Sequence, residues 1–431
     1  SAVCTPTRYG LVTGRYCWRS SLKRGVLDGY SEHLIEPDRF TIADLFKTKG
    51  YATACFGKWH LGMDLPLQDK MKLDLKGTVE NGPMANGFDR FYGITASLDF
   101  PPYVFISDDK IDAEAVEQKP ARRFPDYLRA GETGTNFKHE KVQDQLVEVA
   151  TGFIREQAKA QKPFFIYLAL PSPHKPVLPT ARFQGKSGIG PYGDYVMQTD
   201  WSVGEVMKAV RESGVDDNTM IIYTSDNGSF MYRLDAPECP PKMPSDSNNP
   251  ENGSDHKSDP TIQGFNSSSH RPNFIYRGTK ADIYEGGHHV PFLVRMPGRF
   301  NGGQLISTTI SLVDILATCA DILGVNVPEG AAEDSFSFYP LLTGEGGYVR
   351  APVIAHSVNG SFALYHKSWK FIATKGSGGR TLPMSKPFEK PYQLFDRSND
   401  IEERNNLIDV HPEMAQRLEA ELMAIIGTSL K

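Results

Sequence analysis

The chain has 431 residues, of which 39% are hydrophobic and 23% are charged, and its formal net charge is −5. These values are ordinary for a globular protein, and the length allows one large domain and a smaller one. The weak negative charge gives no electrostatic reason to expect nucleic acid or an anionic membrane as a partner. No apolar run approaches the ~18 residues of a transmembrane helix, and no Cys-x-x-Cys pair or His/Cys cluster indicates a zinc site.

The first expected element is a helix that begins within the run CTPTR at residues 4–8. Pro6 suits a first helical turn, because the N–H that it lacks is unpaired there anyway. Positions i and i+4 share a helix face, so Arg8 lies alongside Cys4. A helix N-terminus favours anions, and the guanidinium fork of Arg8 suits an oxyanion. The run predicts a nucleophile at an anion site, although alone it also fits a thiol beside a surface arginine.

A second candidate follows in the run GKWH at residues 57–60. In an extended chain the side chains of Lys58 and His60 point the same way. A cation and an imidazole on one face suit an oxyanion site. The alternative is a solvated lysine beside a packed histidine.

Three short apolar runs, at residues 163–170, 219–224 and 290–295, do not alternate with polar residues. Such runs are typical of strands buried on both faces, as in a parallel sheet. Helical patterns lie between them, for example at residues 142–160 and 200–213. Strands that alternate with helices predict crossover units and a three-layer α/β fold.

Polar candidates follow two of these runs. His174 comes just after the first run, and Asp226 and Asn227 come just after the second. In open α/β sheets ligands bind beyond the carboxyl ends of the strands. A histidine donates a proton near neutral pH, and the oxygens of Asp and Asn suit calcium or magnesium. The alternative for residues 226–228 is an ordinary turn, and we expect Lys175 to lie on the surface.

The chain is expected to form two domains, of residues 1–340 and 341–431. Residues 229–273 are rich in Pro, Ser, Asn, Asp and Gly, which predicts a long insertion, either inert or acting as a lid over the substrate cleft. Beyond residue 341 the pattern changes to that of a hairpin, a further strand and a terminal helix. The segments that predict these elements are residues 361–365, 369–373, 392–395 and 412–426.

The motifs occur in the order of a known family. The run CTPTR, followed by TGR at residues 13–15, resembles the Cys-x-Pro-x-Arg signature of type I sulfatases. The later blocks in the family's order are GKWH at residues 57–60, His174-Lys175, SDNG at 225–228 and KADIYEGG at 280–287. The chain is thus similar to the formylglycine-dependent sulfatases of the alkaline phosphatase-like superfamily. This resemblance implies a three-layer α/β sandwich with a mostly parallel central sheet, plus a small antiparallel α+β subdomain at the C-terminus.

The resemblance also implies a mechanism. Cys4 is expected to be oxidised to formylglycine (3-oxoalanine) by a formylglycine-generating or anaerobic sulfatase-maturing enzyme. One oxygen of the hydrated aldehyde would then attack the sulfur of a sulfate ester. The family's motifs imply roles for Arg8, Lys58, His60, His174 and Lys280.

The implied roles differ among these residues. Lys58, His174 and Lys280 bind the sulfate, while Arg8 holds the diol oxygen or the sulfate. His60 is the base that expels the sulfate, and His174 protonates the leaving alcohol, with Lys280 as the alternative acid. Two further residues, Asp226 and Asn227, form half of a site for Ca²⁺, with Mg²⁺ as the alternative.

The chain departs from the family in two places. After the paired glycines the family has arginine, whereas this chain has His288-His289, to which we assign no catalytic role. The family's Asp-Asp pair, which supplies the other metal ligands, would precede the cysteine motif and is absent. Neither Asp108-Asp109 nor Asp216-Asp217 follows a buried strand, so neither pair replaces it. Ca²⁺ takes ~6–8 oxygen ligands, so we expect these 431 residues alone to bind metal poorly and to have little activity.

The leading hypothesis is a sulfuric ester hydrolase that acts on a sulfated carbohydrate in the periplasm, outside the cell or in lysosomes. One alternative is a phosphate or phosphonate ester hydrolase of the same superfamily, because phosphate and sulfate are nearly isosteric. Another is a non-catalytic protein that binds sulfated glycans and keeps Cys4 unmodified.

Overall fold

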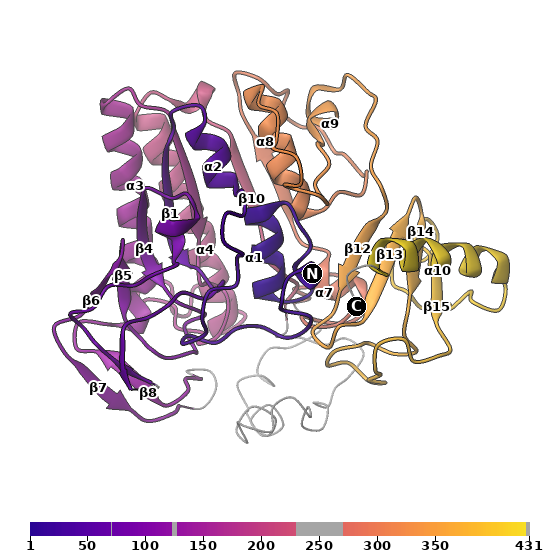
Figure 1. Ribbon diagram of the computed structural model, residues 1–431, viewed down its shortest axis with the longest axis horizontal. Helices are drawn as coiled ribbons and strands as arrows, with labels where there is room; N and C mark the ends of the chain where they lie inside the picture. Colours follow the sequence, from indigo (N-terminus) through magenta and orange to yellow (C-terminus); the bar gives the residue numbers. More distant parts are fainter. Residues whose placement is uncertain (70, 123–126, 230–269, 428–431) are drawn as a thin grey trace.

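The computed structural model describes residues 1–69, 71–122, 127–229 and 270–427. Its central sheet has five strands in the order β6-β5-β4-β1-β9 (Figure 1). The parallel strands are β1 (Ala52–Lys58), β4 (Arg90–Ile94) and β9 (Phe164–Ala169). The antiparallel strands at one side are β5 (Phe105–Ser107) and β6 (Lys110–Asp112).

Strand β1 is buried along its whole length, because helices cover both faces of the sheet. On one face Phe56 packs against Phe153 of α3 (Val142–Lys159). On the other face Cys55 shares a core cluster with residues of α1 (Cys4–Thr13) and α2 (Ile42–Lys47). Figure 1 shows α1 and α3 on opposite sides of β1. The predicted three-layer α/β fold is therefore confirmed.

Two of the three apolar runs do not join the parallel sheet. Strands β10 (Ile221–Thr224) and β11 (Phe292–Arg295) pair with each other in an antiparallel sheet of their own. The expectation that these runs are buried on both faces is wrong, since Leu293 is 59% exposed and Tyr223 is 38% exposed. An apolar run indicates partial burial, but the choice of strand partner depends on segments far away in the sequence.

The C-terminal part is an antiparallel sheet with a helix packed on it. Leu418, Leu422 and Ile426 of the helix are fully buried in a cluster with the strands. The expected hairpin, third strand and helix are confirmed, and one further strand precedes them. In chain order these elements are β12 (Val353–His356), β13 (Phe362–His366), β14 (Trp369–Ile372), β15 (Gln393–Asp396) and α10 (Pro412–Ile426). The expected domain boundary near residue 340 stays a prediction.

The remaining elements are short, apart from the long helix α4, which packs against α3. The α-helices are α4 (Pro191–Glu212), α7 (Glu285–His288), α8 (Ile315–Leu323) and α9 (Tyr339–Thr343). The strand pairs are β2 (Leu67–Asp69) with β3 (Lys72–Leu73), and β7 (Val116–Lys119) with β8 (Gly131–Gly134). The 3-10 helices are η1 (Cys17–Arg19), η2 (Pro83–Asn86), η3 (His139–Lys141), η4 (Asp216–Asn218) and η6 (Leu312–Asp314).

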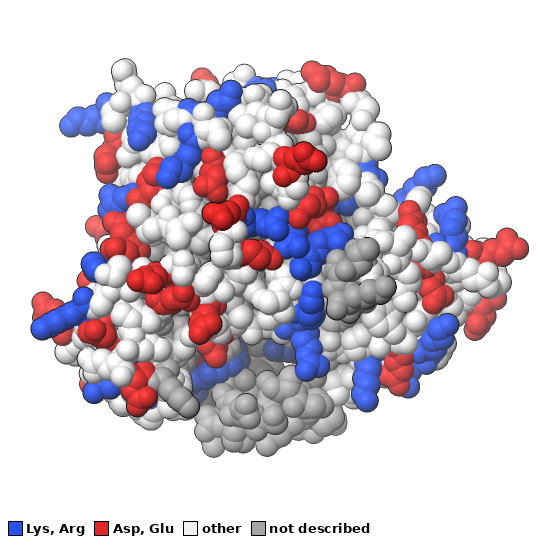
Figure 2. Space-filling model, in the orientation of Figure 1, with Lys and Arg blue, Asp and Glu red and all other residues white. Residues whose placement is uncertain are grey.

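Most of the expected insertion at residues 229–273 lies outside the described residues. Within the described part, no helix combines the length and apolar character needed to cross a bilayer. Figure 2 shows basic and acidic side chains interspersed over one face, in keeping with the small net charge of −5.

Candidate active site

Helix α1 begins at Cys4, as the sequence predicts. Val3 caps it in an extended conformation, and Pro6 occupies the first turn. The helix ends at Gly14, whose φ of 66° lies in the left-handed region and whose N–H donates to the Gly10 carbonyl. Such a cap favours glycine, because a Cβ is strained at that φ. The buried Cys4 side chain thus sits at a helix N-terminus, where a negative charge is stabilised.

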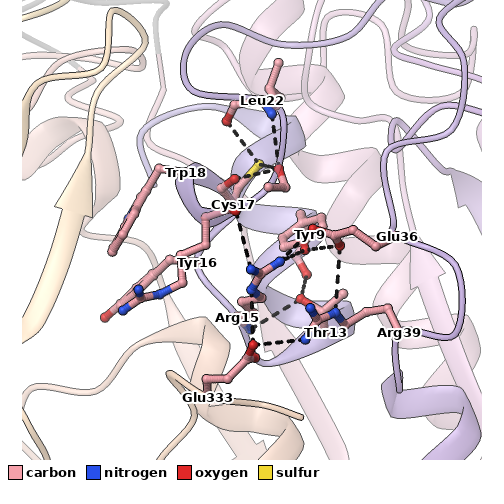
Figure 3. A network of polar contacts seen from close by, with 12 residues as sticks. Tyr9, Thr13, Arg15, Tyr16, Cys17, Trp18, Leu22, Glu36, Arg39 and Glu333 are labelled. Carbon is pink, nitrogen blue, oxygen red and sulfur yellow. Dashed lines mark hydrogen bonds and ion pairs between the residues drawn. The ribbon is translucent and has the colours of Figure 1, made fainter. Parts of the chain in front are cut away.

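The far end of α1 is fixed by ion pairs around Arg15 (Figure 3). Arg15 Nη1 lies 2.6 Å from Glu36 Oε1, and Arg15 Nε lies 3.2 Å from Glu333 Oε1. The hydroxyl of Tyr9, which is also on α1, donates to Glu36 Oε2 at 2.6 Å. These contacts give a structural role to the TGR run and fix the orientation of the helix that carries Cys4.

Arg8 links three parts of the site from the buried side of α1. Its Nε donates to Asp226 Oδ2 at 2.9 Å, and its Nη1 donates to the Lys58 carbonyl at 2.7 Å. Burial alone would lower the pKa of Arg8, but Tyr167, Asp226 and Cys4 raise it, so the guanidinium stays charged. Tyr167 is a partner that the sequence did not indicate, since it lies within an apolar strand.

Lys280 reaches Cys4 directly. Its Nζ donates to Cys4 Sγ at 3.2 Å, and its side chain is buried. The backbone on either side is fixed, because Lys280 N donates to the Ser229 carbonyl and Ala281 N donates to the Ala2 carbonyl. The sequence predicted this lysine from a motif block 276 residues away from Cys4.

Lys58 is the last residue of β1 and lies buried beside the same carboxylate, with its Nζ 3.9 Å from Asp226 Oδ2. Burial lowers its pKa. His60 lies beyond the strand and has a φ of 58°, so strand alternation does not align it with Lys58. That part of the expectation is wrong, because the extended conformation ends at Lys58.

The hydrogen bonding of His60 fixes its tautomer. His60 Nε2 lies 2.8 Å from the Leu27 carbonyl, which can only accept, so Nε2 carries a proton. Burial, followed by the charge of Lys58, holds the pKa of His60 well below 6.5, so the ring is neutral. Its Nδ1 is then an unprotonated nitrogen, and it is buried without a hydrogen-bond partner among the described residues. This arrangement suits a base.

His174 lies in the loop after β9. Its Nδ1 lies 2.7 Å from the Lys175 carbonyl, which can only accept, so Nδ1 carries the proton of the neutral ring and Nε2 is unprotonated. Burial, and then the charge of Lys280, holds the pKa of His174 well below 6.5, whereas Asp99 opposes this effect. His174 is therefore neutral near pH 7, whereas the sequence led us to expect a histidine that donates a proton near neutral pH.

Asp226 and Asn227 follow β10, as predicted. Burial alone would raise the pKa of Asp226, but Arg8, Lys58 and Lys280 hold it well below its usual range. Asn227 Oδ1 is buried without a hydrogen-bond partner in the described part of the chain, which suits a metal ligand. However, the described residues contain no group of three or more His, Cys, Asp or Glu arranged for a metal. They do not fit a complete calcium site, which takes ~6–8 oxygen ligands.

Lys175 is not the surface residue that the sequence led us to expect. Its side chain is 13% exposed, its Nζ lies 3.8 Å from the ring centroid of Tyr127, and the same atom lies 3.7 Å from Asp99 Oδ2. Burial lowers its pKa to about 7. Neither partner could be identified from sequence spacing, because both lie on loops between distant elements.

The two histidines that replace the family's arginine support the turn. His288 Nε2 donates to the hydroxyl of Tyr365 at 2.5 Å, since that hydroxyl donates to Glu285. His289 Nδ1 lies 2.8 Å from Glu285 Oε2. Both contacts fasten α7, which follows the segment that carries Lys280.

Hydrogen bonds and an ion pair join Arg8, Lys58 and Asp226, and a separate hydrogen bond joins Lys280 to Cys4. The charge of Lys280 acts on both Lys58 and Asp226, so the two groups lie within electrostatic reach of each other and form one cluster. The charges of Lys58 and Lys280 also lower the pKa values of His60 and His174, which places both imidazoles within electrostatic reach of this cluster. A set of cations around a buried nucleophilic position can stabilise a small oxyanion.

Several known proteins are similar to this chain over most of its length. A curated N-acetylgalactosamine-6-O-sulfatase of Bacteroides thetaiotaomicron is 30% identical, over 99% of this chain and 84% of the relative. Arylsulfatase A of Bos taurus is 28% identical, over 96% of this chain and 76% of the relative. A solved structure from work on glycosaminoglycan metabolism by Bacteroides thetaiotaomicron has a TM-score of 0.83 at 29% identity, covering 98% of this chain and 89% of that one.

A further solved structure, a sulfatase from Pseudoalteromonas sp., has a TM-score of 0.72 at 20% identity and covers 99% of this chain and 81% of that one, which supports the fold. The family model described as Sulfatase matches residues 1–325, three quarters of the chain. The chain therefore belongs to the sulfatase family of sulfuric ester hydrolases.

Proposed function

We propose that this protein hydrolyses a sulfate monoester on a carbohydrate, with a nucleophile derived from Cys4. The observation that carries the proposal is the 3.2 Å contact between Lys280 Nζ and Cys4 Sγ. Sγ stands in for an oxygen of the formylglycine diol. Lys280, Lys58 and Arg8 then surround the position where negative charge develops during attack on sulfur.

Maturation requires a partner enzyme. Conversion of Cys4 to formylglycine is a net two-electron oxidation at Cβ, in which sulfur leaves as H₂S and oxygen takes its place. The formylglycine-generating or anaerobic maturing enzyme supplies the electron acceptor. Water then adds to the aldehyde and gives the geminal diol. The family resemblance favours the periplasm, the extracellular space or the lysosome as the compartment.

In the proposed reaction one diol oxygen loses its proton to water and forms a bond to sulfur, while the bond from sulfur to the sugar oxygen breaks. The leaving oxygen takes a proton from Nε2 of protonated His174, with Lys280 as the alternative donor. Burial and the charge of Lys280 lower the pKa of His174, and the negative charge of a bound sulfate would favour its protonation. General acid assistance of this kind contributes about 10²–10⁴ in rate.

The second half of the reaction restores the aldehyde. His60 Nδ1, the unprotonated ring nitrogen, takes the proton of the remaining hydroxyl. The C=O bond forms again as the bond from carbon to the sulfate oxygen breaks, and sulfate leaves. We further propose that Asp226 and Asn227 would contribute two oxygen ligands to a Ca²⁺ or Mg²⁺ site, whose ion would polarise a sulfate oxygen and stabilise the deprotonated diol.

The test uses the protein expressed from its natural gene together with a formylglycine-generating enzyme. Turnover of 4-nitrophenyl sulfate and 4-nitrophenyl phosphate is compared, and N-acetylgalactosamine 6-sulfate is tested because of the named relative. We expect sulfate turnover that Cys4→Ala abolishes. Dominant phosphate turnover would support the phosphate ester hydrolase instead. Tight binding of the sulfated sugar without turnover of any sulfate ester would support the non-catalytic alternative.

A further inference from the structure

We propose that Asp99 is a positioning residue for His174, which it orients and stabilises in the protonated form that releases the sugar oxygen. This inference rests on the proposed hydrolysis of sulfate esters. The motifs of the sequence did not indicate a role for Asp99, and the mechanism above does not use it.

Asp99 is a buried carboxylate aimed at the turn that carries His174. It is 1% exposed, and its Oδ1 lies 3.7 Å from His174 Nδ1. Oδ1 has no hydrogen-bond partner within the described residues, whereas Oδ2 accepts from Arg129 Nη1 at 2.6 Å. Oδ2 also lies 3.7 Å from Lys175 Nζ. One carboxylate therefore contacts both residues of the His174-Lys175 turn.

The position of Asp99 is itself well defined. Its carbonyl accepts from Arg129 Nη1 at 3.1 Å and from the hydroxyl of Tyr103, also at 3.1 Å. The guanidinium of Arg129 stacks 3.8 Å above the ring of Phe100. A buried charge held by several hydrogen bonds moves little, so it can set the position of its neighbours.

The direction of the contact fits proton donation. Since His174 Nδ1 donates to the Lys175 carbonyl, a second proton goes to Nε2, on the opposite side of the ring from Asp99. The negative charge beside Nδ1 therefore stabilises the imidazolium without occupying the donating nitrogen.

The other charges near His174 act against protonation. Lys280 and Lys58 both disfavour the imidazolium, and Asp99 is the carboxylate that opposes them. Lys175 and Arg129 in turn hold the pKa of Asp99 well below its usual range, although burial alone would raise it. Asp99 thus stays ionised while His174 gains or loses its proton.

The test is Asp99→Asn in the matured, full chain, with two substrates that differ in the oxygen they release. 4-Nitrophenolate leaves without a proton, whereas a sugar alkoxide requires one. We expect kcat/KM for the sugar 6-sulfate to fall about 10²-fold, which is the lower end of the rate effects of general acids. We expect kcat/KM for 4-nitrophenyl sulfate to fall by less than about tenfold. The decline of kcat/KM for the sugar sulfate at high pH should begin at a lower pH, because His174 loses its proton more readily without the charge of Asp99. The exposed Asp217→Asn serves as the matched control and should behave as wild type.

A merely structural role predicts a different result. Equal losses for both substrates, with the decline at high pH unmoved, would overturn the inference. In a His174→Ala background, adding Asp99→Asn should cause no further loss, because the carboxylate acts through the imidazole. If the single variant fails to fold with Arg129 unpaired, Asp99→Asn/Arg129→Gln removes both charges and allows the same comparison. A wild type without sulfate turnover overturns the proposed function and this inference together, whereas an active wild type with an unchanged variant overturns this inference alone.

Discussion

At the scale of single residues, the site depends on the contact between Lys280 and Cys4, and backbone hydrogen bonds fix the segments that carry both residues. Ala281, next to Lys280, has a φ of 86°, a conformation that costs energy for a residue with a Cβ. Hydrogen bonds from Ala281 N to Ala2 and from Val358 N to Ala281 hold it there. The buried ammonium is thereby placed before any substrate arrives, which is the condition for electrostatic stabilisation of a developing charge.

Lys280→Ala is expected to lower kcat for 4-nitrophenyl sulfate by about 10²–10³-fold, the range for loss of one oxyanion donor. The backbone hydrogen bonds of Lys280 and Ala281 remain, so the unfolding midpoint should change little. The matched control is Lys208→Ala on α4, where the lysine side chain is 54% exposed. A Lys280→Ala variant with wild-type kcat would show that this ammonium does not act on the reacting group.

Sequence reasoning identified residues whose position follows from local geometry or from a motif. Cys4 and Arg8 share a helix face, and a proline in the first turn marks where that helix begins. The sequence did not identify Asp99 or the burial of Lys175. Their partners, Arg129 and Tyr127, lie on a loop far away in the sequence, and no periodicity connects the two segments.

At the scale of elements, a buried lysine joins the C-terminal sheet to α7. Lys370 Nζ on β14 lies 2.6 Å from Glu403 Oε1 and 3.2 Å from Glu285 Oε1. Burial alone would raise the pKa of Glu285, but Lys370 holds it well below its usual range, while burial raises the pKa of Glu403. Lys370 thus forms ion pairs with two carboxylates, and one of them, Glu285, is the first residue of the helix that follows Lys280.

Lys370→Met should lower the free energy of unfolding by about 3–5 kcal/mol, because it removes a buried cation from two buried carboxylates, of which Glu285 keeps Arg397 at 3.5 Å. Urea unfolding measures the change. The matched control is Lys208→Met, which removes an exposed i,i+4 pair with Glu212 and should cost at most about 0.5 kcal/mol. The double variant Lys370→Met/Glu403→Gln should regain part of the loss. A cost for Lys370→Met as small as that of the control would contradict this account.

The helices and strands could largely be predicted from the sequence, but the pairing of the strands could not. The run at residues 163–170 became a strand of the parallel sheet, whereas the similar runs at 219–224 and 290–295 paired with each other in antiparallel fashion. Local sequence indicates strand propensity, but it did not determine burial, since Leu293 is 59% exposed. Pairing direction is set by how the connecting segments pack, and a single run of apolar residues contains no information about that.

At the scale of the whole molecule, backbone hydrogen bonds join three distant segments around the nucleophile. Ala2 N donates to the His356 carbonyl of β12, Ala281 N donates to Ala2, and Ile283 N donates to Ser377. The C-terminal sheet also packs on Ile283 and Tyr284 through a buried cluster. Helix α1, the Lys280 segment and the C-terminal sheet therefore form one packed unit (Figure 1), which the sequence did not predict.

Stability should fall in mild acid because buried histidines cannot take up protons in the folded state. Burial lowers the pKa of His356 from 6.5 to about 3. Below pH 6.5 the unfolded chain binds a proton that the folded chain does not, so the free energy of unfolding decreases as pH falls from 6.5 towards 3. The largest slope for one such histidine is about 1.4 kcal/mol per pH unit.

The measurement is urea unfolding of wild type and His356→Phe between pH 8 and pH 5. The variant should lose less stability than wild type below pH 6.5, and the difference between the two proteins should be constant above pH 7.5, where the histidine is neutral in both states. Parallel curves over the whole range would show that His356 does not contribute to the acid sensitivity.

The central claim is that Cys4 becomes the aldehyde whose hydrate attacks sulfate, and one measurement tests it most directly. The protein is purified after expression with a formylglycine-generating enzyme, and the mass of the peptide that contains Cys4 is determined alongside turnover of 4-nitrophenyl sulfate. We predict the mass of the aldehyde, in a fraction of molecules that rises in proportion to kcat. Full sulfatase activity in a preparation whose Cys4 remains a thiol would contradict the account.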